Sequence, residues 1–185
     1  MGFGGMLGPT KFQFDNLIIR AIWQWRGRAK DLINALNLGV GNTNMENSLQ
    51  RFLDAQQHDY PVALSEIKNG KKHGHWMWYI FPQIAGLGFS ETSKFYAIKD
   101  IAEAKVFLEH PVLGSRLIAI CEALLPLTSN NALSIFGSPD DMKLRSSMTL
   151  FSAVPGADPV FNAVLDKFFT GIRDERTMEK IAAGK

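Results

Sequence analysis

The amino-acid sequence predicts an all-α fold, a single compact multihelical domain of short helices joined by loops that proline and glycine punctuate. Helix-capping residues followed by apolar positions at helical spacing recur along most of the chain. The period-2 alternation of β-branched residues that marks strands is absent. With 185 residues, 46% of them hydrophobic and 21% charged, the chain can bury one core.

The first two helices of this domain are expected on either side of Asp59. Ser48 is a good N-cap for a short helix over residues 48–53. Asp59 precedes residues 60–67, in which apolar side chains recur at i, i+3, i+4 and i+7 before Gly70. The pattern therefore predicts two short helices in this region.

Later helices are predicted by further caps and by prolines in first turns. The expected signals are Ser90 for residues 91–97, Asp100 for residues 101–108, Pro111 for a helix to about Leu125, Asn130 for one closed by Gly137, Pro139 for residues 140–151, and Pro159 for one that ends before Gly171. The apolar run 76–81 cannot be assigned by periodicity alone, and its neighbours favour a helix. The side chains expected to be largely buried are Phe52, Leu64, Ile67, Trp78, Phe81, Phe107, Leu117, Leu124, Met148, Phe151, Phe161 and Phe168.

Residues 1–44 are expected to form an accessory or loosely packed N-terminal extension, followed by the helical domain at residues 45–185. Apolar residues recur at helical spacing inside the extension, but glycines cluster at its start and in residues 39–44. The extension holds five basic and two acidic residues, a net charge of +3, whereas the remainder carries −1.

Charge, cysteine content and hydropathy argue against several classes of protein. The pI of about 8.7 reflects the extension, so no nucleic-acid partner is expected for the main domain. The single Cys121 cannot form an intramolecular disulfide, which fits a reducing cytoplasm. No apolar run approaches the roughly 20 residues of a membrane helix, and no secretory signal is visible. Motifs for nucleotide cofactors are absent as well, and no cofactor is expected.

The first candidate site is the stretch 71–83, in which cationic and imidazole side chains precede a run of aromatic residues. Burial of large apolar side chains contributes about 1.5–3 kcal/mol each, so the run belongs in the core. Polar groups at its ends must then find partners or line a cavity. Trp76 and Trp78 are core residues or the wall of a pocket. His73 and His75 diverge on a helix, and no metal site is expected.

The second candidate site is the polar segment 140–151. On a helix, Asp141, Arg145 and Thr149 share one face. Arg145 could hold an anion there, with hydroxyl groups as orienting donors. The alternative is a solvated face with an ion pair worth under about 1 kcal/mol. Such mediocre helix formers inside an apolar protein favour a functional role, and we expect this segment to share one cleft with residues 70–75.

These segments resemble, in unbroken order from about Ser48 to Ile181, the family called domain of unknown function 1810. The stretches that carry the resemblance include ALSEIKNGKK at 63–72, HWMWYIFPQ at 75–83, HPVLGSRL at 110–117 and KLRSSMTLF at 143–151. The resemblance implies a mostly helical, cytoplasmic, bacterial domain without an established activity. Some members are named calpastatin, but calpain inhibitors of that kind are extended segments, which does not fit a chain rich in core aromatic residues.

The family's recurring polar positions imply a set of site residues. Glu66 or His75 is the candidate catalytic acid or base. The candidate ligand-binding residues are Gln56, Lys72, Trp76, Trp78, Gln83, His110, Arg116, Lys143, Arg145, Ser146 and Thr149.

Two classes of function are compatible with these features. The first is a domain that binds or processes a small anionic ligand, nucleotide-like or ADP-ribose-like, in a polar and aromatic cleft. The second is a protein-interaction module that uses the aromatic segment as a groove, without catalysis. The sequence does not decide whether the protein is an enzyme. Collection of Glu66, His75 and Arg145 in one pocket would favour the first class, and an exposed aromatic patch the second.

Overall fold

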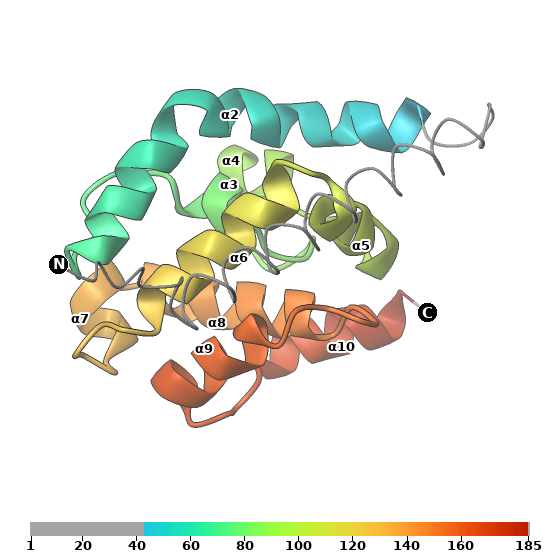
Figure 1. Ribbon diagram of the computed structural model, residues 1–185. Coiled ribbons are helices and arrows are strands. Elements are labelled where there is room, and N and C mark those ends of the chain that lie inside the picture. The colour runs from blue at the N-terminus through green and yellow to red at the C-terminus, as the bar shows by residue number, and fades with distance from the viewer. Residues whose placement is uncertain (1–42, 185) are drawn as a thin grey trace, which may run out of the picture. The chain divides into compact units, whose positions relative to one another are not determined.

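The computed structural model describes residues 43–184, with side chains from residue 48 onward, and these residues form a helical domain (Figure 1). The predicted all-α class is confirmed. In chain order the helices are α2 (Thr43–Lys68), α3 (Met77–Ile80), α4 (Glu91–Phe95), α5 (Ile101–Glu109), α6 (Leu113–Leu124), α7 (Ala132–Phe136), α8 (Asp140–Ser152), α9 (Val160–Phe169) and α10 (Glu175–Ala183). In this part of the chain, extended pairing is limited to a single parallel bridge between Ile84 and Ile98.

Two helices begin at predicted caps, Ser90 and Asp100, whereas α10 and its cap Asp174 were not predicted. The side chains of Ser90, Asp100 and Asp174 each accept a hydrogen bond from the backbone N–H three residues later, at the starts of α4, α5 and α10. Asn131, one residue after the predicted Asn130, does the same for α7. Side-chain caps therefore set the starts of α4, α5, α7 and α10.

The two short helices predicted around Asp59 are wrong, because α2 is one helix of 26 residues with Pro61 inside it. Its apolar face is continuous across the proline, with Phe52 buried before it and Ile67 after it. Tertiary packing of that face offsets the backbone hydrogen bond that proline cannot make. Figure 1 shows the helix bending in this region.

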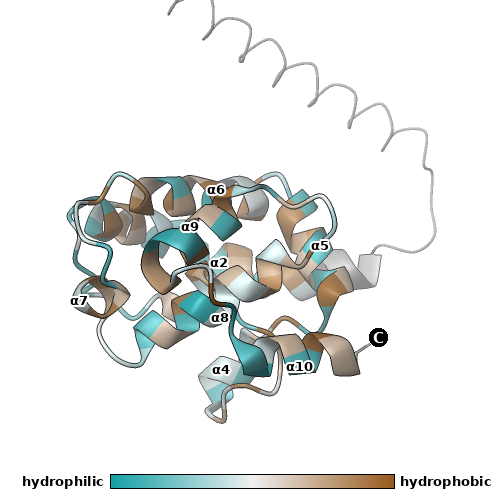
Figure 2. Ribbon diagram, turned by 90° about the horizontal axis from the view of Figure 1, so that it is seen from below, coloured by the Kyte–Doolittle hydropathy of each residue, from teal (hydrophilic) through white to brown (hydrophobic). Residues whose placement is uncertain are grey.

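The core is organised around α8, which contacts α5, α7, α9 and α10. Six consecutive α8 residues, from Ser146 to Phe151, are buried, so this helix is enclosed on most sides. A chain of ring contacts runs from Phe52 through Phe107 and Phe151 to Phe161, with centroid separations of 5.1, 5.4 and 5.8 Å. Figure 2 shows hydrophobic and hydrophilic residues interspersed along the helices, as expected when each has one buried side.

Nine of the twelve side chains predicted to be buried are buried. Leu64, Trp78 and Phe168 are only partly buried. The Trp78 ring is partly exposed because it lines a cleft at the surface. None of the helices over residues 43–184 is long and apolar enough to cross a membrane.

The predicted extension lies outside the described residues, apart from the first two residues of α2. Deleting residues 1–44 is expected to leave a cooperatively unfolding domain, since the described residues from Leu49 to Ile181 form a core cluster of their own. Urea denaturation of the truncated and full chains would check this expectation. A loss above about 3 kcal/mol, the scale of a core truncation, would contradict it.

Candidate functional site

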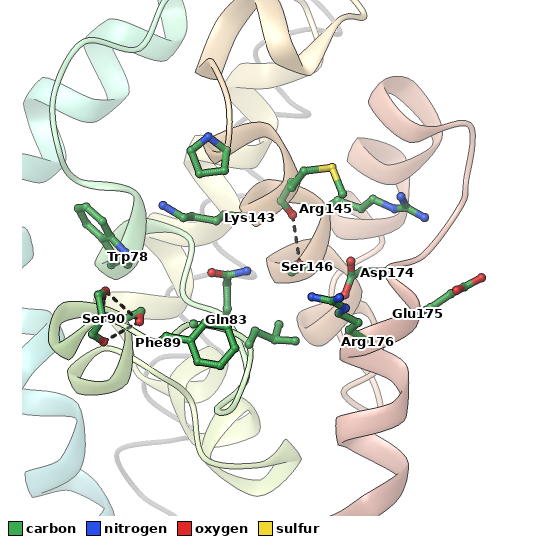
Figure 3. A pocket seen from close by; sticks show the side chains of 15 residues that line it. Trp78, Gln83, Phe89, Ser90, Lys143, Arg145, Ser146, Asp174, Glu175 and Arg176 are labelled. Atoms are coloured by element: carbon green, nitrogen blue, oxygen red, sulfur yellow. Dashed lines mark hydrogen bonds between the residues drawn. The ribbon is translucent and has the colours of Figure 1, made fainter.

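A cleft of about 710 Å³ lies where three parts of the chain meet (Figure 3). One side is α8, another is the start of α10, and the third is the segment from α3 to α4. We call it the main cleft. Its lining residues are Trp78, Gln83, Leu87, Gly88, Phe89, Ser90, Ser93, Pro139, Met142, Lys143, Arg145, Ser146, Asp174, Glu175 and Arg176.

The aromatic part of the main cleft consists of Trp78 and Phe89. Trp78 is half-buried at the short helix α3, and the ammonium group of Lys143 lies 4.6 Å from its ring centroid. Phe89 is 86% exposed although it lines the cleft. Gly88 lets the loop approach α4, because a Cβ there would lie 2.5 Å from Ser93. The loop thus presents a large ring to solvent at the cleft mouth.

Lys143 belongs to a charged group that connects α8 with the loop after α2. Its ammonium lies 2.7 Å from Asp140, and the same carboxylate lies 2.7 Å from the ammonium of Lys72. Partial burial acts to raise the pKa of Asp140, but the hydrogen bonds and charges of Lys143 and Lys72 hold it below its ordinary value. One carboxylate therefore neutralises two cations incompletely, and the group keeps a net positive charge.

Arg145 is positioned by backbone carbonyl groups. Its Nε donates to the carbonyl of Ile172 at 3.0 Å, and a terminal nitrogen donates to that of Arg173 at 2.7 Å. Figure 3 shows the side chain extending towards the α9–α10 connection. A guanidinium has five N–H donors, so three are not used by these bonds. No carboxylate in the described part of the chain forms an ion pair with it.

The start of α10 supplies the third cation and two carboxylates. Asp174 is occupied as the N-cap, where it accepts hydrogen bonds from the backbone N–H and the hydroxyl of Thr177. Glu175 is exposed and lines the edge of the cleft (Figure 3). Arg176 is exposed and makes no ion pair within residues 48–184. The cation at this end of the cleft is therefore Arg176, which lies next in sequence to the exposed carboxylate of Glu175.

Comparison with known proteins places the chain in a family. The model for "protein of unknown function (DUF1810)" matches residues 46–181. The chain belongs to this family. A solved relative is the conserved hypothetical protein Rv1873 from Mycobacterium tuberculosis, with 41% sequence identity and a TM-score of 0.71 over 72% of this chain and 96% of the other. The search of curated proteins found no match.

Five of the predicted DUF1810 site residues line the main cleft: Trp78, Gln83, Lys143, Arg145 and Ser146. Phe89 and Arg176 also line the cleft but were not predicted, because they lie outside the stretches that resemble the family. A bulky ring beside the glycines at 86 and 88 is a local sign of a presented side chain. No local signal marks Arg176, because its role depends on where α10 packs.

The candidate acid or base residues lie elsewhere. The Glu66 carboxylate accepts hydrogen bonds from the backbone N–H groups of His73 and Gly74 and from the indole N–H of Trp76, at 2.7–3.1 Å. His75 is exposed and does not line the main cleft. Glu66 therefore holds the loop that follows α2.

Four other predicted residues hold helices together. Gln56 is buried, donates to the carbonyl of Tyr79 at 2.7 Å and accepts from Arg116 at 3.4 Å. Arg116 also lies over the ring of Tyr60. The Nδ1 of His110 accepts from backbone N–H groups at the start of α6. Trp76 is 2% exposed and part of the core.

The polar side chains of α8 are largely turned inward. Thr149 is fully buried; its hydroxyl donates to the carbonyl of Arg145 at 2.8 Å and accepts from the N–H of Asp174 at 2.9 Å. Ser146 is buried and donates to the carbonyl of Met142 at 3.1 Å. The hydroxyl of Thr149 therefore connects α8 with the start of α10, whereas that of Ser146 bonds within its own helix. Asp141 and Arg145 form no ion pair.

The two predicted candidate segments touch through Lys72 and Asp140, but they do not share one cleft, because none of residues 70–75 lines the main cleft. Lys72 reaches Asp140 from the loop that Glu66 holds, and its ammonium also donates to the carbonyl of Gly74 at 2.6 Å. Lys72 of this loop thus pairs with the same carboxylate as Lys143. Among the described residues, no group of three or more histidine, cysteine or acidic side chains is arranged to hold a metal ion.

Proposed function

We propose that the main cleft binds a small anionic ligand with a planar group, nucleotide-like or ADP-ribose-like. The observation that carries this proposal is that Lys143, Arg145 and Arg176 line the same cleft as Trp78 and Phe89. Cations hold phosphate or carboxylate groups through charge-assisted hydrogen bonds, and the rings offer faces for a planar group. The cleft volume of about 710 Å³ suits a ligand of that size.

The charge balance of the cleft supports an anion. The carboxylate of Asp140 forms ion pairs with two lysines, and that of Asp174 accepts the N-cap hydrogen bonds of α10. The N-terminus of α10, a helix of nine residues, adds a partial positive charge at the same edge. An anion would therefore meet cations whose charges the protein compensates only in part.

Binding is better supported than catalysis. Neither Glu66 nor His75 lines the main cleft. The carboxylates that do line it are the helix-capping Asp174 and the exposed Glu175 at its edge (Figure 3). The alternative of a groove formed by the aromatic segment is not favoured, because Trp76 and Phe81 are buried in the core.

Isothermal titration calorimetry with ADP, ATP, UDP and ADP-ribose tests the proposal. At least one ligand is expected to bind, and a ligand at 100 times its Kd should stabilise the fold by about 2.7 kcal/mol. Arg176→Ala is expected to weaken binding about tenfold or more, because it removes a charge-assisted hydrogen bond. It should leave the melting temperature nearly unchanged, since the side chain is exposed.

The matched control is Lys105→Ala, which removes an exposed cation of α5 that does not line the main cleft. This variant should bind like the wild type. Failure of all four ligands to bind, or equal affinities for Arg176→Ala and the wild type, would refute the proposal.

A further inference from the structure

A second cavity adjoins the main cleft. It has a volume of about 310 Å³, and we call it the side cavity. Its lining residues are Gly86, Leu87, Phe89, Arg176, Glu179 and Lys180. Leu87, Phe89 and Arg176 also line the main cleft, so one exposed ring and one guanidinium stand between the two spaces.

The side cavity offers a different chemistry from the main cleft. Glu179 and Lys180 lie three and four residues after Arg176 on α10, and therefore on the same face of that helix. Neither side chain forms an ion pair within the described residues. A free carboxylate accepts hydrogen bonds from hydroxyl groups, and an ammonium donates them. The same carboxylate repels an additional phosphate group.

The loop before α4 passes close to the end of the Lys180 side chain. Gly86 has a φ of +86°, and a Cβ at this position would lie 3.2 Å from both Cε and Nζ of Lys180. The loop backbone therefore passes directly over the end of this side chain. This close approach gives the side cavity one wall of backbone and another of α10 side chains.

We infer that the ligand has two parts joined by a diphosphate, as in a nucleoside diphosphate sugar. This inference rests on the proposed function. The base lies in the main cleft with Trp78, the diphosphate at Arg176, and a hydroxylated terminal group in the side cavity with Glu179 and Lys180. A volume of about 310 Å³ has room for one small ring. A nucleoside triphosphate would place its third phosphate beside Glu179 and is disfavoured.

Calorimetric titration of two ligand pairs, ADP with ADP-ribose and UDP with UDP-glucose, tests the inference. Within a pair the base and diphosphate are the same, and only the terminal sugar differs. In at least one pair the sugar-bearing ligand is expected to bind at least fivefold more tightly. Glu179→Ala should remove most of that difference while changing the Kd of the plain diphosphate less than twofold. Glu109→Ala, which removes an exposed carboxylate of α5 that lines neither cavity, is the control and should change neither Kd.

The outcomes separate this inference from the proposed function. If ADP or UDP binds but the sugar adds no affinity, the two-part ligand is wrong and the proposed function stands. Equal effects of Glu179→Ala on both members of a pair, or no effect on either, also overturn it. If none of the four ligands binds, the inference falls together with the proposal on which it rests. Thermal melting of both variants checks that they are folded.

Discussion

Replacing Gly114 with alanine is expected to lower the free energy of unfolding by about 3 kcal/mol, at the upper end of typical overpacking. Gly114 is buried in the first turn of α6, where the helix approaches the end of α5. A Cβ there would lie 2.7 Å from the carbonyl carbon of Leu108 and closer still to its oxygen. Because these are backbone atoms, they cannot rotate away, and the two helices would have to separate.

Urea denaturation followed by circular dichroism measures the effect. Gly184→Ala is a matched control, because a Cβ at Gly184 would lie 3.6 Å from the nearest atom, an ordinary contact. The control should change stability by less than about 0.5 kcal/mol. Similar denaturation midpoints for Gly114→Ala and the wild type would show that α5 and α6 do not need this close approach.

The helical class and most helix boundaries could be predicted from sequence, because caps act within a few residues. Ser90 and Asp100 bond to the N–H groups that their positions predict. The continuity of α2 could not be predicted, since Pro61 is a local stop signal that only packing of the surrounding apolar face overrides. At Pro61, long-range packing therefore keeps the helix continuous, although the local rule predicts that it ends there.

The candidate site was predicted only in part, for the same reason. Lys143, Arg145 and Ser146 share one segment, and their polarity was visible in the sequence. Arg176 joins them because Thr149 and Arg145 bind the backbone of residues 172–174 and so fix the start of α10 beside α8. Thr149 was predicted to bind a ligand, whereas its hydroxyl is occupied by the protein backbone.

Glu66→Ala is expected to cost about 2–3 kcal/mol near neutral pH, because it leaves the buried indole N–H of Trp76 and the N–H of Gly74 without their acceptor. Denaturation midpoints of the variant and the wild type measure this loss. Glu91→Ala is the control, since Glu91 is exposed and only pairs with Lys94 one turn away. A loss no larger than that of the control would contradict this role of Glu66.

The cost of Glu66→Ala should also depend on pH. Burial acts to raise the pKa of Glu66, but the N–H donors of His73, Gly74 and Trp76 hold it below its ordinary value. A depressed pKa stabilises the fold above the pKa of the unfolded chain, and that contribution is lost as the pH falls through the lower, folded-state value. The difference between wild type and variant should thus be present near neutral pH and shrink below about pH 4. A difference that does not change with pH would show that the charge of Glu66 is not what holds the loop.

The same variant connects the loop to the main cleft. Glu66 fixes the backbone of residues 73 and 74, and the carbonyl of Gly74 accepts from Lys72, which pairs with Asp140. Loosening the loop should therefore release Lys72 and leave Asp140 to Lys143 alone, which pulls that ammonium more firmly to the carboxylate. The expected result is a weaker affinity for nucleotides in Glu66→Ala, by less than the tenfold loss of Arg176→Ala, although Glu66 does not line the cleft. An unchanged affinity in a folded Glu66→Ala variant would show that Lys143 keeps its position without the loop.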